Sequence, residues 1–283
     1  MGLTAPFRSG RRRFLATPLA LAAPAALANE RPLQVGVLPN LSARTLMTQY
    51  QPFRQFLEGE LSRPVEIITA PGMRAFHERA LAGNYHLTVT AANLARIAET
   101  DAGMVPISMY EPRIPGTLVT RRDRPLSSLE QARGSAVALT NPLSLVALTF
   151  RQWASGQGLE PGRDLLLLEA RNEDSLAELL ATGAARLAVM SRGEFNAIRP
   201  AIREQLEVAE IFATVPGFIA LLAPDLDPAL ARRIGNCLAL FRDTDLGRRF
   251  LAETGFTGLR RITSADLDEV DPVVPETRRL LAA

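Results

Sequence analysis

Three short stretches place hydroxyl or amide side chains where a predicted strand gives way to a predicted helix, at residues 40–42, 90–93 and 140–144. The first turn of a helix leaves backbone N–H groups without partners and carries the positive end of the helix dipole. A strand-to-helix turn can therefore bind an anion. The same residue types are also the usual N-caps of helices. These stretches are thus candidate donors to a small anion, with helix capping as the alternative at every position.

The third stretch gives the clearest local signal. Residues 136–139 form a short apolar run, as in a buried strand, and a helical pattern follows from about Leu143. An Asn or Thr before a helix, with a proline near its first turn, is typical of a helix N-terminus. We expect Thr140, Asn141 and Ser144 to face the space beyond the sheet edge, either as ligand donors or as caps.

The sequence has few residues that could bind a metal, bind a nucleotide or catalyse a reaction. His77 and His86 are the only histidines, and neither has a second ligand at metal-binding spacing. No glycine-flanked serine nucleophile, P-loop or dinucleotide-binding glycine pattern occurs. Acids such as Glu173 and Asp174 begin a predicted helix, where they favour the dipole. The single Cys237 lies in a helical pattern and is expected in a core. We therefore expect no enzyme, no metal and no cofactor.

The first 28 residues predict export. They hold four arginines and no acid, followed by an apolar run and an Ala-Leu-Ala pattern typical of signal-peptide cleavage. The run Arg11-Arg12-Arg13-Phe14-Leu15 resembles a twin-arginine signal, with a Sec signal or a membrane anchor as alternatives. Without this segment the net charge changes from +2 to +2 − 4 = −2. The charge therefore gives no reason to expect nucleic-acid binding, and we expect a periplasmic location.

Strands and helices alternate in two blocks, at residues 33–110 and 134–212. Such alternation predicts α/β architecture with parallel sheets. After the second block the chain ends in predicted helices, which we expect to return to the first block. The chain would then cross twice between two lobes. The expected lobe I comprises residues 29–114 and 216–283, and lobe II comprises residues 115–215. Ligands bind beyond the carboxyl ends of such strands, so the two lobes would enclose a cleft that can close.

Six short runs share their order and spacing with a known family: Val35-Gly36-Val37-Leu38-Pro39, Tyr50-Gln51-Pro52, Arg63-Pro64-Val65-Glu66, Thr69-Ala70-Pro71, Gly83-Asn84-Tyr85-His86-Leu87 and Thr90-Ala91-Ala92. Together they resemble the phosphate, phosphite and phosphonate solute-binding proteins of ABC transporters, although the typical family member has Asp where His86 stands. The resemblance is strongest over residues 33–98. It implies the two-lobed type II periplasmic-binding-protein fold, in which two parallel or mixed sheets are flanked by helices and joined by two crossover strands.

The resemblance also implies ligand contacts. Phosphonate binders carry a Ser-Thr-Ser run after a proline, and the matching run here, Asn141-Pro142-Leu143-Ser144-Leu145-Val146, keeps only the hydroxyl of Ser144. A family histidine matches Asn172. Two acids that hold the ammonium of aminophosphonates match Glu194 and Phe218, and the apolar Phe218 argues against such a ligand. The candidate ligand-binding residues are Asn40, Ser42, Thr90, Ala91, Asn93, Thr140, Asn141, Ser144, Asn172 and Glu194.

We predict a periplasmic solute-binding protein of an ABC importer that captures a small oxyanion, such as phosphate, phosphite or a phosphonate, in an interlobe cleft. Its partners would be that anionic or polar small molecule and an ABC transporter permease, and it would act as a monomer. The alternative is a periplasmic sensing subunit that signals to a membrane sensor kinase. An enzyme on the same fold is disfavoured because no nucleophile or acid–base constellation is evident.

Overall fold

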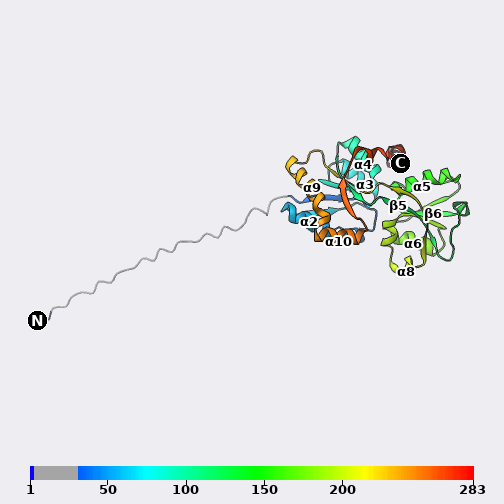
Figure 1. Cartoon of the computed structure of the whole chain (residues 1–283), viewed down its shortest axis with the longest axis horizontal. Helices are drawn as coiled ribbons and strands as arrows, with labels where there is room; N and C mark the ends of the chain where they lie inside the picture. Colours follow the sequence, from blue (N-terminus) through cyan, green and yellow to red (C-terminus); the bar gives the residue numbers. More distant parts are fainter. Residues whose placement is uncertain (3–30) are drawn as a thin grey trace. The chain divides into compact units, whose positions relative to one another are not determined.

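The computed structural model describes residues 1–2 and 31–283 (Figure 1). The predicted export signal, residues 1–28, therefore lies outside the described residues except for its first two, and it stays a prediction. Residues Arg31–Ala283 form one compact unit. No helix in the described part of the chain is long and apolar enough to cross a membrane.

The first sheet is mixed and has six strands in the order β11-β4-β10-β3-β1-β2. β1 pairs in parallel with β2 and β3, whereas β10 runs antiparallel to β3 and β4, and β11 runs antiparallel to β4. The strands are β1 (Leu33–Val37), β2 (Val65–Ile68), β3 (Leu87–Thr90), β4 (Val105–Glu111), β10 (Ile219–Leu222) and β11 (Gly258–Arg261). The expected return of the chain to the first block is thus observed as β10. The strand β11 was missed, because only helices were predicted after residue 227.

The second sheet is also mixed and has five strands in the order β7-β6-β8-β5-β9. β6 pairs in parallel with β7 and β8, while β5 runs antiparallel to β8 and β9. The strands are β5 (Ile114–Arg121), β6 (Ala136–Leu139), β7 (Leu166–Glu169), β8 (Leu187–Ser191) and β9 (Leu206–Val215). The strands that arrive from the other sheet, β5 and β10, run antiparallel to both of their neighbours. The predicted fold class, two parallel or mixed sheets flanked by helices, is confirmed.

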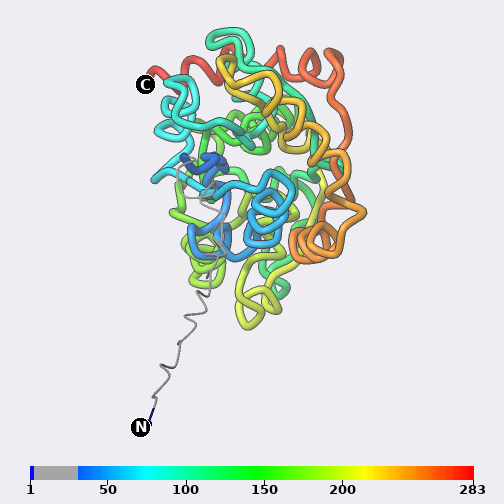
Figure 2. The backbone as a smooth tube through the Cα atoms, turned by 90° about the vertical axis from the view of Figure 1, so that its left-hand side faces the viewer, coloured from blue at the N-terminus to red at the C-terminus, as the bar shows by residue number. Residues whose placement is uncertain are grey.

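Helices cover both sheets (Figure 1). Those that follow strands of the first sheet are α1 (Ala43–Gln49), α2 (Gln51–Leu61), α3 (Met73–Leu81), α4 (Ala92–Ala102), α9 (Pro228–Leu240), α10 (Asp245–Thr254), α11 (Ser264–Asp268) and α12 (Val274–Ala282). Those of the second sheet are α5 (Leu145–Gly156), α6 (Glu173–Ala181), α7 (Arg192–Ala197) and α8 (Pro200–Arg203), and three 3-10 turns are η1 (Leu129–Ala132), η2 (Phe241–Asp243) and η3 (Asp271–Val273). The helical pattern of residues 43–61 is divided into two helices at Tyr50, because Pro52 has no N–H and lies in the first turn of a new helix. The C-terminal helix α12 lies beside α4 (Figure 2).

The chain passes between the sheets twice, from β4 to β5 and from β9 to β10. These two crossovers lie side by side, since the Tyr110 N–H donates to the Phe218 carbonyl at 2.9 Å. A Cβ atom at Gly217 would overlap the Tyr110 carbonyl oxygen, so this close approach requires glycine. We propose that the crossovers mark the lobe boundaries given above, with residues 29–114 and 216–283 in lobe I and residues 115–215 in lobe II.

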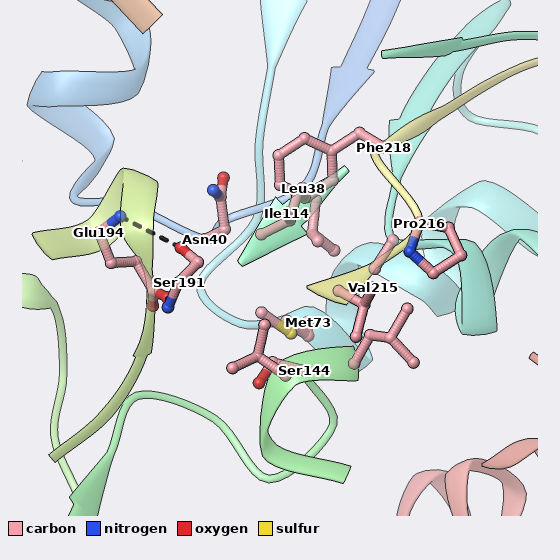
Figure 3. Close-up of a pocket in the computed structure, with 13 residues that line it drawn as sticks. Leu38, Asn40, Met73, Ile114, Ser144, Ser191, Glu194, Val215, Pro216 and Phe218 are labelled. Atoms are coloured by element: carbon pink, nitrogen blue, oxygen red, sulfur yellow. Dashed lines mark hydrogen bonds between the residues drawn. The ribbon is translucent and has the colours of Figure 1, made fainter. Parts of the chain in front are cut away.

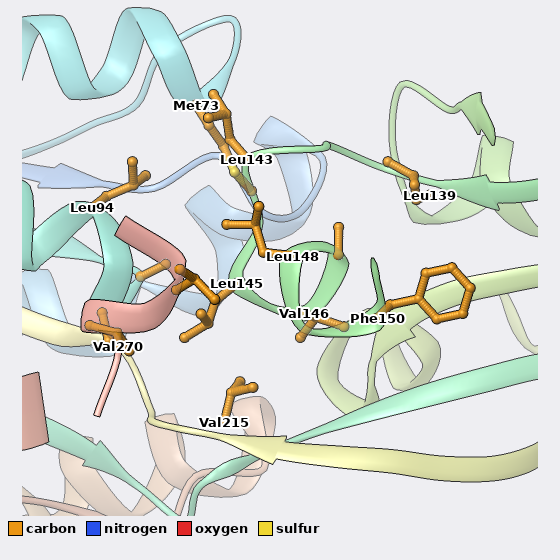
Figure 4. Close-up of a cluster of buried hydrophobic side chains, with 14 of the residues drawn as sticks. Met73, Leu94, Leu139, Leu143, Leu145, Val146, Leu148, Phe150, Val215 and Val270 are labelled. Carbon is orange, nitrogen blue, oxygen red and sulfur yellow. The ribbon is translucent and has the colours of Figure 1, made fainter. Parts of the chain in front are cut away.

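Two hydrophobic clusters serve different parts of the molecule. The first, which we call the aromatic core, lies within lobe I and includes Tyr50, Phe53, Phe56, Phe241 and Phe250. Cys237 belongs to it, and burial raises the pKa of this thiol. The second, which we call the bridging core, draws side chains from both lobes (Figure 4). It includes Met73, Leu94, Leu143, Leu145 and Val146. A smaller cluster around Leu176 and Leu180 belongs to lobe II alone.

Candidate functional site

A cleft between the two sheets contains two adjoining hollows that share Asn40, Ile114, Ser191 and Phe218. The inner hollow has a volume of about 40 Å³ and the outer one about 180 Å³. The inner hollow is lined by Leu38, Asn40, Met73, Ala91, Ile114, Ser144, Leu145, Val146, Ser191, Glu194, Val215, Pro216 and Phe218. Both lobes contribute to this lining, as expected for a ligand cleft between two α/β sheets.

Polar groups reach the inner hollow from three turns, while most of its wall is apolar (Figure 3). Ser144 and Ser191 are the N-caps of α5 and α7, and their hydroxyls accept from the backbone N–H groups of Ala147 and Glu194, each at 3.1 Å. A serine hydroxyl that accepts in this way keeps its own proton to donate. Two helix starts of lobe II therefore bring hydroxyl donors to the hollow that Asn40 of lobe I also lines.

Glu194 lines the inner hollow but is held by its own lobe. It is only 6 % exposed, and its two carboxylate oxygens accept from the Ser191 N–H and the Thr140 hydroxyl, each at 2.7 Å. Burial raises the pKa of this carboxyl, and the bonds from Ser191 and Thr140 oppose that rise because they favour the charged form. The geometry is a capping box on α7, in which the Ser191 hydroxyl accepts from the Glu194 N–H and the Glu194 carboxylate accepts from the Ser191 N–H.

The turn between β6 and α5 differs in detail from the expected one. α5 begins at Leu145 rather than near Leu143, and its N-cap is Ser144. The Asn141 side chain instead accepts from the Leu143 N–H at 2.8 Å, which closes a local turn ahead of the helix. The Thr140 hydroxyl donates to Glu194. Of the three polar residues predicted here, only Ser144 lines the inner hollow.

The predicted ligand contacts in the turns of lobe I also fall into two groups, those that line a hollow and those that do not. Asn40 lines both hollows and Ala91 lines the inner one. Thr90 is 2 % exposed, and its hydroxyl has no partner in the described part of the chain. Asn93 is fully buried, and its side-chain amide donates to the Leu143 carbonyl at 3.1 Å and to the Thr277 hydroxyl at 3.2 Å. Asn93 therefore joins the lobes rather than lining the hollows.

Ser42 and Asn172 are helix caps. Ser42 caps α1 and accepts from the Thr45 N–H at 3.3 Å, and Asn172 caps α6 and accepts from the Ser175 N–H at 2.9 Å. The Ser42 N–H donates to the carboxylate of Glu173 in lobe II. From the sequence alone, Glu173 is expected only to favour the dipole of its own helix. Its position next to the predicted contact Asn172 was the one available signal of a cleft residue.

The outer hollow contains residues that were not among the predicted ligand contacts, including Gln49, Tyr50, Arg192, Asn196 and Phe256. Arg113, which lies near the first crossover, also lines it. The Arg113 guanidinium pairs with Glu269, at 2.8 Å for one bond, and donates to the Thr214 carbonyl at 2.8 Å. The hydrogen bond to Glu269 raises the pKa of Arg113, so its charge is already neutralised by a carboxylate. The guanidinium of Arg192 lies 6.0 Å from the ring centre of Phe195.

The arrangement is suited to binding. In the described part of the chain, no group of three or more His, Cys, Asp or Glu side chains is placed to hold a metal ion. The polar groups of the inner hollow can orient a small polar head, and the apolar wall can hold a compact hydrocarbon group beside it. This combination of few placed polar groups in a mainly apolar concavity is typical of small-molecule sites.

Comparison with known proteins gives a family match over most of the chain. The sequence profile of the family described as "ABC transporter, phosphonate, periplasmic substrate-binding protein" matches residues 35–267. No curated protein matches the chain significantly in sequence. The family resemblance noted in the sequence is therefore confirmed by the profile.

Solved structures share the fold at low sequence identity. A binding protein component of an ABC phosphonate transporter from Pseudomonas aeruginosa is 14 % identical with a TM-score of 0.77, covering 88 % of each chain. PhnD1 from Prochlorococcus marinus, solved with methylphosphonate, is 14 % identical with a TM-score of 0.75, covering 88 % of this chain and 98 % of its own. A histidine kinase sensor domain is 20 % identical with a TM-score of 0.56, covering 81 % of this chain and 98 % of its own.

Proposed function

The chain belongs to the family of phosphonate periplasmic substrate-binding proteins of ABC transporters, and we propose that it captures a small phosphonate-like oxyanion in the cleft between its lobes. Members of this family are binding proteins that work in the periplasm with an ABC transporter permease. The observation that carries the proposal is the convergence of two cap hydroxyls, of Ser144 and Ser191, with Asn40 on one hollow. Helix starts with free hydroxyl and N–H donors stabilise anions without a charged side chain.

The wall of the inner hollow favours an organic oxyanion over an inorganic one. Phosphate or phosphite would need donors on every side, but the side chains of Leu145, Val146, Val215 and Phe218 offer only carbon atoms there. A buried anion without hydrogen bonds is strongly disfavoured. An alkylphosphonate can place its oxygens at the serine caps and its alkyl group against this wall. Methylphosphonate, the ligand of the structurally similar PhnD1, is the first compound to test.

A ligand screen on the mature protein tests the proposal. We expect methylphosphonate and other short alkylphosphonates to raise the melting temperature, because a ligand that binds only the folded state stabilises it by RT ln(1 + [L]/Kd). Inorganic phosphate, phosphite and an alkylsulfonate belong in the same screen, and calorimetric titration should then give a one-to-one stoichiometry. The proposal fails if no oxyanion shifts the melting temperature at millimolar concentration. The ligand should be recovered unchanged, since we propose binding without turnover.

Two finer points belong to the same proposal. We expect export through the twin-arginine pathway, which replacing Arg11 and Arg12 by Lys would block in a cell-fractionation assay. We expect a monomer in size-exclusion chromatography with light scattering. Cytosolic retention of the unaltered protein, or a stable dimer, would each contradict the corresponding point.

A sensing role is the second candidate, and the observation that favours it is the fold similarity to a histidine kinase sensor domain. The TM-score of that match, 0.56, is lower than the 0.75 and 0.77 of the two transporter receptors. Deleting the gene separates the two roles. Loss of phosphonate uptake supports transport, whereas intact uptake with a lost transcriptional response supports sensing.

A further inference from the structure

Glu173 is a buried carboxylate of lobe II whose bonding partners lie in lobe I. It is the first residue of α6 and is only 2 % exposed. One carboxylate oxygen accepts from the Ser42 N–H at 3.0 Å, and the other accepts from the Thr45 hydroxyl at 3.3 Å. Ser42 and Thr45 are the N-cap and the third residue of α1. The carboxylate thus lies between the starts of two helices, one from each lobe.

Glu173 is not needed to cap its own helix, because Asn172 already does so through the Ser175 N–H. Its carboxylate instead accepts hydrogen bonds from the first residues of α1 and its N-cap. The Ser42 and Thr45 hydroxyl oxygens are 2.7 Å apart, so the donors that face Glu173 are themselves held in place. Hydrogen bonds to a charged acceptor are stronger than those between neutral groups, and a helix N-terminus adds a favourable dipole.

The lobes are also joined by a second hydrogen bond and by an apolar contact. The Asn93 amide of lobe I donates to the Leu143 carbonyl of lobe II at 3.1 Å. The bridging core packs Met73 and Leu94 of lobe I with Leu145 of lobe II. All of these groups belong to the chain itself, so this set of contacts can form without any ligand.

We propose that Glu173 is an interlobe clasp, a positioning residue that holds α6 of lobe II against the start of α1 of lobe I and keeps the cleft walls together before a ligand arrives. Separating the lobes would take the carboxylate from its two donors, and the cost of that step favours the closed arrangement. A ligand that binds the closed arrangement then meets a larger population of competent molecules. The clasp goes beyond the proposed function, since it does not depend on which ligand binds.

Distance measurements between the lobes test the clasp in the absence of any ligand. Spin labels attached through Gln55→Cys on α2 and Glu204→Cys after α8 would report the interlobe separation by pulsed electron paramagnetic resonance, because both positions are exposed. The Cys237 thiol is buried and would remain unlabelled in the folded protein. The labelled protein with Glu173 intact should give one narrow distance distribution.

Glu173→Ala in the labelled protein should broaden and lengthen this distribution. We expect the ratio of open to closed molecules to rise roughly ten-fold or more, the change that corresponds to losing one charge-assisted hydrogen bond. Thr45→Val removes one donor from the lobe I side while keeping the side-chain shape, so it should shift the ratio in the same direction by a smaller factor. Glu178→Ala is the matched control, since Glu178 lies on the same helix but pairs with Arg199 inside lobe II.

Identical distance distributions for the parent protein, Glu173→Ala and Thr45→Val would overturn the clasp. An opening of the lobes by Glu178→Ala as large as that by Glu173→Ala would also overturn it. If Glu173→Ala fails to fold, Thr45→Val decides the question alone. Because no ligand is added, failure of the clasp leaves the proposed function intact, and failure of every oxyanion in the screen leaves the clasp intact.

Discussion

The aromatic core and the bridging core differ in what they hold together. The aromatic core joins elements of lobe I only, with ring centres 5.1 Å apart for Phe53 and Phe241 and 5.2 Å apart for Tyr50 and Phe250. The bridging core is mainly aliphatic where the lobes meet, and it joins Met73 and Leu94 to Leu145 (Figure 4). Edge-to-face aromatic pairs have preferred geometries, whereas aliphatic contacts are not directional.

This difference indicates which contacts would persist and which would break if one lobe moved against the other. The aromatic core would stay intact in any movement of one lobe against the other. The bridging core would have to come apart, and its polar links through Asn93 and Glu173 give an otherwise non-directional contact a defined register. Leu145 and Val146 belong to this core and stand at the positions where the family resemblance implies hydroxyl donors to a phosphonate.

The largest expected effect is on the aromatic core. Phe53→Ala should lower the free energy of unfolding by about 3–5 kcal/mol, because Phe53 is fully buried and leaves a cavity. Denaturant unfolding measures this loss, and calorimetry on the fraction that remains folded should give an unchanged ligand Kd. Phe195→Ala in lobe II is the control, because Phe195 is only partly buried and should cost less. A changed Kd would show that the aromatic core is coupled to the cleft.

Acid should weaken the side of lobe I that contacts the bridging core. His77 on α3 is 4 % exposed, and burial lowers its pKa from 6.5 to about 4, with Asp101 raising it and Arg278 lowering it further. Between pH 6.5 and 4 the unfolded chain therefore binds more protons at His77 than the folded chain does. The stability that comes from burying a neutral His77 is fully present above pH 6.5 and is lost as the pH falls to 4. The loss is about 3 kcal/mol at 1.36 kcal/mol per pKa unit. Unfolding of His77→Gln should depend less on pH over this range, and equal pH dependence would contradict the assignment.

Leu145→Ala should separate packing from ligand choice. We expect a loss of about 2 kcal/mol in stability, at the low end for such changes because the residue borders a hollow. The enlarged inner hollow should accept longer alkylphosphonates, which a titration series from methyl to butyl would show as a shifted optimum. Leu176→Ala, in the cluster of lobe II alone, should cost stability without shifting that optimum. An unshifted optimum in Leu145→Ala would place the alkyl group elsewhere.

The smallest expected effect on stability comes from Ser144→Leu. Loss of the N-cap of α5 should cost about 1 kcal/mol, while the larger side chain fills the inner hollow and weakens ligand binding at least ten-fold. Thr244→Leu removes a comparable N-cap, from α10, and should leave the ligand Kd unchanged. Unaltered binding in Ser144→Leu would show that the α5 turn is not part of the ligand site.

The order of strands and helices could be predicted from the sequence because the hydrophobic period of each element is local. The errors fell where local signals conflict or are weak. β11 carries two arginines in four residues, and the restart at Tyr50 follows a helical pattern that continues through it. Contacts across the cleft could not be predicted in this way. Glu173 lies 131 residues from Ser42, and Asn93 lies 50 residues from Leu143, so no spacing within one element reveals either pair.

The contact of the two crossovers at Gly217 has a consequence for inherited variation. Every missense change of a glycine codon adds a Cβ atom, and here that atom would overlap the Tyr110 carbonyl oxygen whichever amino acid carried it. Pro216 and Phe218, on either side, line the inner hollow, so a displaced backbone would move the wall of that hollow as well. Position 217 should therefore tolerate no replacement in a saturation-mutagenesis library selected for phosphonate uptake, while Gly72, where an added Cβ would meet open space, should tolerate many.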